Sequence, residues 1–526
     1  MSAELSTEAG DPGDHSWGEI VLGQARRFPD VVALTDEHGG RLDYRGLADE
    51  MRRAAGYWRA AGVGSGDRVA VLGRNSVELV VNVLGLTWLG AAPVLLNWRL
   101  APGELAELGR LCAPRAIAYD ADFAAGAAAV LPAGHRVVML GGSAGGAPTT
   151  AVERRSAVPD AADGPAAGAV LALLHTSGTT GLPKVIALTQ QAYLWGCRRL
   201  VTAAGMTERA VHLRFTPLFH LAGLQEIGSS VLSGGTTHLQ TAFDPDIWLD
   251  AVALHGVAYG HLPPATMRRV VAAYEARERK PDLSTLREVW YGTAPASREL
   301  VTAALAALGC DLRQVYGMTE AQSPVALLGA DDHRPGSRGI GTAGRILPEW
   351  EVRFQAPDGS EVPAGEPGEL VVRGRPLFSG YWSPAGAGGN GIDAEGWYRT
   401  GDVAILDSDG YLTVVDRVKD MVISGGENIY PAEVERVLSG YPQVQELSVI
   451  GVPDEQWGER VHAVVVPRTP GGFDTDDFLQ WCRDRIAGFK RPRSVEIVDE
   501  LPRNPSGKVL KRELRARHLA STTRSS

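Results

Sequence analysis

Short apolar segments alternate with helical patterns through the first four hundred residues. Residues 68–72 and 93–96 are almost entirely apolar, which is typical of strands buried on both faces. Between them, residues 76–88 have the pattern of a helix that Ser76 caps and that carries Glu78 in its first turn. Strands of this kind joined by helices form parallel sheets covered on both faces. We therefore expect an α/β fold whose large N-terminal part has parallel-rich sheets covered by helices.

The size and charge of the chain limit what it can be. Its 526 residues are too many for one core and predict two or more domains. The net charge of −10 disfavours nucleic acid or an anionic membrane as the main partner. The four cysteines lie far apart, without the spacing of a metal or redox site. They are expected as free thiols in a reducing cytoplasm.

Neither end of the chain nor its most apolar run indicates a membrane segment. Residues 1–15 are acidic, without a basic start or an apolar core, so we expect a disordered tail and not a signal peptide. The run 79–98 has the length of a spanning helix. Because residues 90–93 read Gly-Ala-Ala-Pro, we expect a buried helix, a turn and a buried strand there instead.

Residues 176–184 form a loop rich in glycine and hydroxyl groups, and an apolar segment precedes it. Its glycines allow backbone N–H groups to converge on an anion, and Lys184 adds a positive charge. The spacing is not that of the Walker A loop, because Pro183 and Val185 flank the lysine. A plain surface loop is the alternative for this segment taken alone. The residues expected to hold phosphates are Thr176, Ser177, Gly178, Thr179, Thr180, Gly181 and Lys184.

Four further segments follow in a fixed order, at residues 316–320, 397–402, 416–420 and 504–508. With the loop at 176–184, they resemble the adenylate-forming superfamily of acyl- and aryl-CoA synthetases, luciferases and nonribosomal-peptide adenylation domains, in its AMP-forming acyl-CoA synthetase branch. The resemblance covers roughly residues 18–517.

The resemblance implies a division into domains. It places an N-terminal domain that binds ATP and the acid at residues 16–416, and a hinge at 417–420 that includes Lys419. A small mobile α+β domain carrying the catalytic lysine follows at 421–518, and a tail at 519–526.

The implied reaction activates a carboxylic acid with ATP and Mg²⁺ as an acyl-adenylate, with release of pyrophosphate, and then transfers the acyl group to CoA. An aryl or a short- to medium-chain acid is expected. One alternative is a natural-product enzyme that passes the acid to a carrier-protein thiol, or that uses an unusual acid such as nitrite in a diazotization. A non-catalytic scaffold is the other alternative, which the intact motifs disfavour. The oligomeric state stays open, a homodimer included.

The resemblance assigns roles around the nucleotide. Glu320 would be the magnesium ligand, a role that suits a hard carboxylate oxygen, and Thr319 would touch the α-phosphate. Tyr316 would lie against adenine, although a core aromatic is the alternative. The remaining residues of this expected adenine site are Gly292, Thr293, Ala294, Pro295, Gly317 and Met318.

Three residues near the hinge and beyond it complete the predicted adenylation site. Asp402 would bind both ribose hydroxyls and Arg417 would add a second ribose contact, with a surface ion pair as the alternative for both. Lys508 would bridge the substrate carboxylate and the α-phosphate, where a flexible cation can neutralise charge that builds up in the transition state.

The sequence signals for the residues that bind the acid and the thiol are weaker. His220 corresponds to a gating residue between the ATP site and the thiol tunnel, although a histidine in an apolar segment is more often part of a core. Val315 would narrow the floor of the pocket. The expected acyl pocket comprises His220, Leu221, Gly292, Val315 and Pro324. The expected CoA contacts, each of which could equally be structural, are Gly425, Gly426, Phe489 and Arg491.

Overall fold

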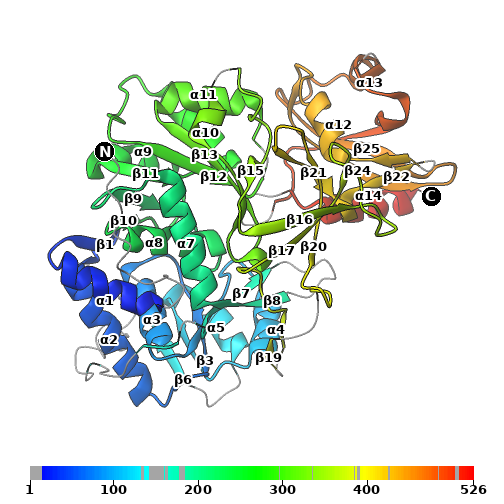
Figure 1. The fold of residues 1–526 in the computed structure, drawn as a ribbon. Helices are drawn as coiled ribbons and strands as arrows, with labels where there is room; N and C mark the ends of the chain where they lie inside the picture. The colour runs from blue at the N-terminus through cyan, green and yellow to red at the C-terminus, as the bar shows by residue number, and fades with distance from the viewer. Residues whose placement is uncertain are drawn as a thin grey trace. The chain divides into compact units, whose positions relative to one another are not determined.

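The computed structural model divides into two compact units, and each is described by itself (Figure 1). The first comprises Met1–Ile340, Leu347–Trp350 and Gly374–Gly396, and the second comprises Gly341–Ile346, Glu351–Arg373 and Trp397–Ser526. The structure describes residues 15–131, 136–140, 159, 164–166, 168–176, 184–294, 296–334, 336–383, 386–387, 391–424, 427–483, 485–503 and 509–525.

One sheet of the first unit has the strand order β6-β5-β3-β4-β7-β8, and only β8 runs antiparallel to its neighbour. The expected strands at 68–72 and 93–96 are its β3 and β4. The strands are β3 (Arg68–Leu72), β4 (Ala92–Leu95), β5 (Ala116–Tyr119), β6 (Arg136–Met139), β7 (Val170–Thr176) and β8 (Lys184–Thr189). The short pair β18 (Trp382–Ser383) and β19 (Gly386–Ala387) also belongs to this unit.

The second sheet of this unit runs β14-β13-β12-β11-β9-β10-β1-β2. Its inner strands are parallel, while β2 and β14 run antiparallel to their neighbours. The strands are β1 (Val32–Asp36), β2 (Arg41–Asp43), β9 (Val211–Arg214), β10 (Thr236–Leu239), β11 (Val257–His261), β12 (Glu288–Gly292), β13 (Asp311–Gly317) and β14 (Pro324–Leu328).

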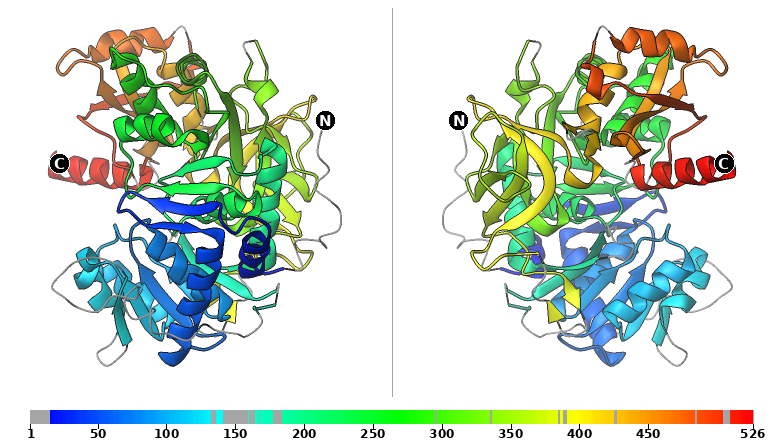
Figure 2. Two further views of the ribbon diagram at one scale, coloured as in Figure 1. Left: turned by 90° about the vertical axis from the view of Figure 1, so that its left-hand side faces the viewer. Right: turned by 90° about the vertical axis from the view of Figure 1, so that its right-hand side faces the viewer.

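Helices form layers on both sheets of this unit (Figures 1 and 2). One apolar core joins α1, α2, α3, α7 and α8 to strands of both sheets. Two others pack α9, α10 and α11 on the second sheet, and α4 and α5 on the first. The helices are α1 (Trp17–Arg27), α2 (Tyr44–Ala60), α3 (Val77–Trp88), α4 (Pro102–Cys112), α5 (Ala124–Val130), α7 (Gln190–Ala204), α8 (Leu221–Leu232), α9 (Pro245–His255), α10 (Pro264–Ala276) and α11 (Arg298–Leu308).

The most apolar run is folded as expected. The Ser76 hydroxyl accepts a hydrogen bond from the Leu79 N–H at 3.1 Å and caps α3, which ends before the turn into β4. Both elements are buried in the core. Among the described residues, no helix combines the length and the apolar character that crossing a membrane requires.

The second unit contains two sheets, of order β16-β17-β20-β21 and β23-β22-β25-β24, with β26 parallel to β25. Helices α12 and α13 pack on one face of the latter sheet, and α14 packs on the other. The elements are β15 (Arg345–Ile346), β16 (Trp350–Gln355), β17 (Gly368–Gly374), β20 (Tyr398–Leu406), β21 (Leu412–Arg417), β22 (Val422–Ser424), β23 (Glu427–Ile429), α12 (Pro431–Leu438), β24 (Val444–Asp454), β25 (Gly458–Pro467), α13 (Thr475–Arg483), β26 (Ser494–Ile497) and α14 (Lys511–Ser525).

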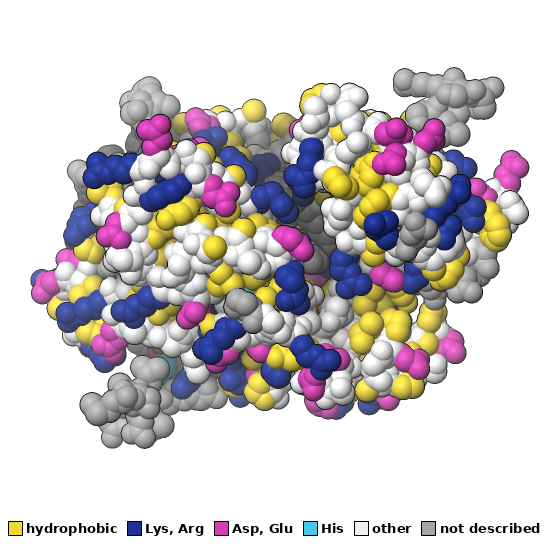
Figure 3. Space-filling view, turned by 90° about the horizontal axis from the view of Figure 1, so that it is seen from above, with side chains coloured by type: hydrophobic (Ala, Val, Ile, Leu, Met, Phe, Trp, Pro, Cys, Tyr) yellow, Lys and Arg dark blue, Asp and Glu magenta, His cyan; other side chains and the backbone are white. Residues whose placement is uncertain are grey.

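The predicted fold class is confirmed, since helices cover parallel-rich sheets and a smaller α+β part follows. Helix α14 continues to Ser525, where the sequence predicts a tail from residue 519. On the face in Figure 3, basic and acidic side chains are interspersed. This view therefore shows no broad surface of one charge.

Candidate functional site

The two ends of the predicted phosphate loop are held by a β-ladder. Strands β7 and β8 are antiparallel, and Thr176 stands opposite Lys184. The loop itself, with Ser177, Gly178, Thr179, Thr180 and Gly181, lies outside the described residues. The ladder nevertheless brings together the first and last members of the predicted phosphate-binding set.

Tyr381 contacts two charged residues of the predicted site. The Lys184 Nζ lies 4.4 Å from the centroid of its ring, and its hydroxyl donates a hydrogen bond to Glu320 Oε1 at 3.2 Å. The Phe378 N–H donates to the Glu320 carbonyl at 2.9 Å and fixes the backbone there. Glu320 is half-buried in the 3₁₀ turn η3 (Thr319–Ala321). A partly exposed carboxylate fits a magnesium ion, which prefers one or two such ligands together with substrate phosphates.

The predicted adenine residues lie where two parallel strands end. Gly292 is the last residue of β12 and stands opposite Val315 of β13, so that Thr293 and Gly317 leave the sheet at the same edge. Ligands bind at this carboxyl edge in open α/β sheets. A Cβ on Gly292 would lie 2.5 Å from the Val315 carbonyl oxygen, so glycine is required there.

Thr293 follows this glycine with φ +67°. Such a backbone conformation is unusual for a β-branched residue and is found mainly at turns and functional sites. Tyr316, near the end of β13, and Met318, just after this strand, are half-buried. Ala294 is described, whereas Pro295 lies outside the described residues.

Gln322 connects this edge to neighbouring elements, and no sequence motif pointed to it. Its side-chain oxygen accepts from the Thr189 N–H at 3.1 Å and its amide donates to the Ala187 carbonyl at 3.3 Å. Its own carbonyl accepts from the Gln225 amide at 2.9 Å. The turn after Glu320 is thereby tied to β8 and α8.

His220 begins the segment that leads into α8. It is half-buried beside Phe219, with the two ring centroids 4.5 Å apart, and the Phe219 ring is stacked near that of His175. Burial lowers the pKa of His220 to about 4, with smaller contributions from the positive charges of His175 and Arg99. Burial also lowers the pKa of His175 to about 4. Both rings are therefore neutral at pH 7.

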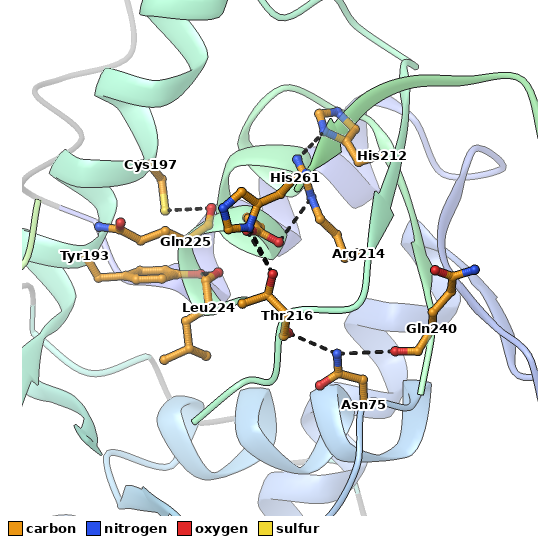
Figure 4. A network of polar contacts seen from close by, with 11 residues as sticks. Asn75, Tyr193, Cys197, His212, Arg214, Thr216, Leu224, Gln225, Gln240 and His261 are labelled. Atoms are coloured by element: carbon orange, nitrogen blue, oxygen red, sulfur yellow. Dashed lines mark hydrogen bonds and ion pairs between the residues drawn. The ribbon is translucent and has the colours of Figure 1, made fainter. Parts of the chain in front are cut away.

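A buried polar network anchors the strand before His220 (Figure 4). The Glu226 Oε1 is 2.5 Å from His261 Nδ1, and Glu226 Oε2 is 3.7 Å from Arg214 Nε. The Thr216 hydroxyl lies 3.0 Å from His261 Nδ1, and the Thr216 carbonyl accepts from Asn75 at 3.0 Å. Burial alone would raise the pKa of Glu226, but His261 and Arg214 hold it below its ordinary value.

This network fixes the end of β9 relative to α8, and the segment with His220 runs between them. The sequence analysis missed it, although one signal was present. Glu226 is the only charged residue in the otherwise neutral segment 221–232, and a buried charge needs a partner.

The predicted acyl residues belong to several elements of the first unit. Val315 is half-buried and packs at the edge of an apolar cluster that includes Tyr259 and Trp290. Leu221 is the first residue of α8, and Pro324 is the first of β14. Their role in binding the acid stays a prediction.

The predicted ribose residues are adjacent in the second unit. Asp402 and Arg417 stand opposite each other on β20 and β21, with the Arg417 Nε 2.5 Å from Asp402 Oδ1. Asp402 is buried, whereas Arg417 is about one-third exposed. The ion pair that the sequence analysis left as an alternative is therefore present, and the ribose role stays a prediction.

The other predicted residues of this unit are the hinge lysine, the CoA contacts and the catalytic lysine. Lys419 lies in the 3₁₀ turn η5 (Val418–Asp420), where burial lowers its pKa. Phe489 is exposed. Arg491 donates to the carbonyls of Ile486 and Arg483 at 3.0 and 2.9 Å, which is a structural role at the end of α13. Lys508, Gly425 and Gly426 lie outside the described residues.

Comparison with known families matches most of the chain. The family described as AMP-binding enzyme matches residues 22–382, and its C-terminal domain matches residues 433–508. The chain belongs to the AMP-binding enzyme family. The earlier resemblance to adenylate-forming enzymes is thereby confirmed.

Relatives of this AMP-binding enzyme match it over nearly their whole length. Feruloyl-CoA synthase of an Amycolatopsis species is 40% identical over 502 residues, which cover 95% of this chain and 98% of the relative. Indoleacetate–CoA ligase of Aromatoleum aromaticum is 37% identical, with 90% and 92% covered. The structure of o-succinylbenzoate CoA synthetase of Bacillus subtilis with its acyl-adenylate intermediate has a TM-score of 0.82 at 29% identity, with 94% and 97% covered.

Proposed function

We propose that this AMP-binding enzyme activates an aryl or a short- to medium-chain carboxylic acid with ATP and transfers the acyl group to CoA. In the first half-reaction a carboxylate oxygen attacks the α-phosphorus, and the bond to the β-phosphate oxygen breaks with release of pyrophosphate. In the second, the thiolate of CoA attacks the acyl carbonyl and AMP leaves. The products are an acyl-CoA thioester, AMP and pyrophosphate.

The observation that carries the proposal is the convergence of Lys184 and Glu320 on Tyr381. A cation from the phosphate loop and a carboxylate suited to Mg²⁺ are thus held by one side chain, although about two hundred residues separate Lys184 from Tyr381 in the chain. The ion, when bound at Glu320, supplies charge neutralisation on the phosphates. Lys184 and the loop before it would hold the β- and γ-phosphates and the departing pyrophosphate.

The other roles follow the family pattern. Thr319 would contact the α-phosphate and Tyr316 the adenine ring. Asp402 would accept hydrogen bonds from the ribose hydroxyls, with Arg417 beside it, and Lys508 would neutralise the charge between the carboxylate and the α-phosphate.

An aryl acid has support from the relatives named for feruloyl and indoleacetate groups. Neutral His220 and the apolar surroundings of Val315 suit an uncharged ring or chain more than a second charged group. The CoA acceptor has support from the same names, and Arg491 stays a predicted CoA contact whose guanidinium also binds two carbonyls.

A screen of acids tests both halves of this proposal. Pyrophosphate release is measured with aromatic acids, fatty acids of increasing length and nitrite, each with and without CoA, and thioester products are identified by mass. We expect pyrophosphate release with aryl acids and an acyl-CoA product only when CoA is present. Turnover without any thiol, or only with a carrier protein, would support the alternative acceptors instead.

A further inference from the structure

A buried histidine ends the apolar layer between the C-terminal sheet and α14. Along β25, alternate residues point to the same face, and Val464 and Val466 of this face pack with Leu514 of α14. His462 occupies the preceding position on that face and is 2% exposed. The apolar layer therefore ends in an imidazole that needs a polar partner.

Two further side chains with ligand atoms meet His462 at this point. Glu496 of β26 places its Oε2 3.5 Å from His462 Nε2, and the ring centroid of His518 on α14 is 4.3 Å from that of His462. One ligand atom from each of the three lies within 4.8 Å of the other two. Three elements far apart in the sequence thus contribute to one cluster within the second unit.

The orientation of His462 is set by its other nitrogen. Its Nδ1 lies 2.8 Å from the Ser494 hydroxyl, and Ser494 is its neighbour in the parallel β25–β26 ladder. Metal-binding histidines commonly use the second ring nitrogen in this way, which fixes the ring and the tautomer. Here the contact directs Nε2 toward Glu496 and leaves it without a hydrogen bond of good geometry.

We propose that His462, Glu496 and His518 bind a divalent transition metal ion, with zinc as the best match. Two imidazoles and a carboxylate form a ligand set that zinc accepts, with a water molecule in the fourth position. The 3.5 Å between His462 and Glu496 is close to the roughly 3.3 Å that separates two ligands of one tetrahedral zinc ion. Small side-chain movements of His518 would complete the site.

The environment allows an ion to enter and be held. The Glu496 side chain is 38% exposed, which provides access from solvent, while His462 is enclosed by the apolar layer. The alternative is a cluster of the same three side chains joined by hydrogen bonds alone. At 3.5 Å, the contact between His462 and Glu496 is too long for a strong bond of that kind.

An ion at this position would join β25, β26 and α14. Strand β26 and helix α14 flank residues 498–510, so the ion would tie together the two ends of the segment that includes Lys508. The direct consequence is stabilisation of the folded second unit, because a ligand that binds only the folded state adds a free energy of stabilisation that grows with the logarithm of its concentration relative to Kd.

Calorimetric titration of the full-length protein, stripped with EDTA and dialysed, tests the site. We expect zinc to bind at one ion per chain in the presence of millimolar Mg²⁺. The variants His518→Ala and Glu496→Gln should each weaken binding at least about tenfold. His38→Ala, which removes an exposed histidine of the first unit, and Glu320→Gln should bind zinc as the parent does.

Two further measurements make the result decisive. Zinc should raise the unfolding temperature of the parent and not that of His518→Ala, and Co²⁺ should give the visible absorption of a tetrahedral ion only in the parent. Circular dichroism checks that both variants fold. No zinc binding by the folded parent, or equal binding by the parent and both variants, would overturn the proposal. Neither readout depends on catalytic activity, so the metal site and the proposed reaction can fail separately.

Discussion

At the scale of single residues, the fold places Tyr381 against two charged residues of the proposed site. Its ring faces the Lys184 ammonium and its hydroxyl binds the Glu320 carboxylate. It can therefore orient the carboxylate without touching a substrate, which is a positioning role.

The variant Tyr381→Phe keeps the ring and removes only the hydroxyl. A hydrogen bond to a charged group contributes about 1.5–3 kcal/mol, so we expect adenylation to slow roughly 10- to 100-fold. The concentration of Mg²⁺ that gives half-maximal pyrophosphate release should rise. Tyr381→Ala, which also removes the contact with Lys184, should lose more activity. If Tyr381→Phe shows the same Mg²⁺ dependence as the parent, the hydroxyl does not position Glu320.

Lys508 is the residue for which the family pattern makes the sharpest prediction. Lys508→Ala should lower adenylate formation by roughly 10²–10³-fold, the scale of losing one group that stabilises transition-state charge. Thioester formation from a supplied acyl-adenylate should persist, because that step does not need this charge. The two half-reactions are measured separately by pyrophosphate release and by mass of the acyl-CoA. An equal loss in both would instead indicate a folding defect.

At the scale of elements, the proposed nucleotide site depends on where strands end. The parallel pair β12 and β13 delivers Thr293 and Gly317 to one edge, and Gln322 ties the following turn to β8 and α8. The sequence predicted only a general alternation of strands and helices in this part of the chain, and the hydrogen bonds of Gln322 depend on which elements become neighbours.

The turn η5 is the element for which we predict a hinge. Proline fixes φ near −65°, a value that is compatible with a 3₁₀ turn. A hinge, however, must change its backbone angles, and proline prevents that change. Lys419→Pro should therefore preserve pyrophosphate release and abolish most thioester formation. Lys419→Ala, which leaves the backbone free, serves as the control and should carry out both half-reactions. Normal thioester turnover in a folded proline variant would place the hinge elsewhere.

At the scale of the whole molecule, buried histidines couple stability to pH. The pKa values of His175 and His220 are lowered by burial to about 4, whereas the unfolded chain binds these protons near pH 6.5. Between these pH values the unfolded state binds more protons than the folded state. The contribution of the two rings to the free energy of unfolding is therefore complete above about pH 6.5 and is lost as the pH falls toward 4.

Each ring contributes up to about 3 kcal/mol across this window. Urea unfolding followed by tryptophan fluorescence at pH 7 and pH 5 should show a lower free energy of unfolding at pH 5. In His175→Asn and His220→Gln the difference between the two pH values should shrink. A difference as large as the parent's in both variants would assign the pH dependence to other groups.

Much of the fold and part of the site could be predicted from local sequence. Apolar runs and the Ser76 cap predicted β3, α3 and β4 because periodicity and capping act over a few residues. The order of short motifs predicted the family, since those motifs are local as well. The CoA contact of Arg491 stays a prediction, and the two carbonyls that its guanidinium binds could not be located from sequence pattern.

The sequence by itself thus determined the α/β class and the family, and it predicted the groups that the proposed reaction would use. Only the tertiary structure decided that Tyr381 meets Lys184 and Glu320, that Glu226 is balanced by Arg214 and His261, and that His462 meets His518. The physical reason is the range of the interactions along the sequence. Secondary structure follows from interactions within a few residues, whereas these contacts depend on sheet order and packing that bring distant segments together.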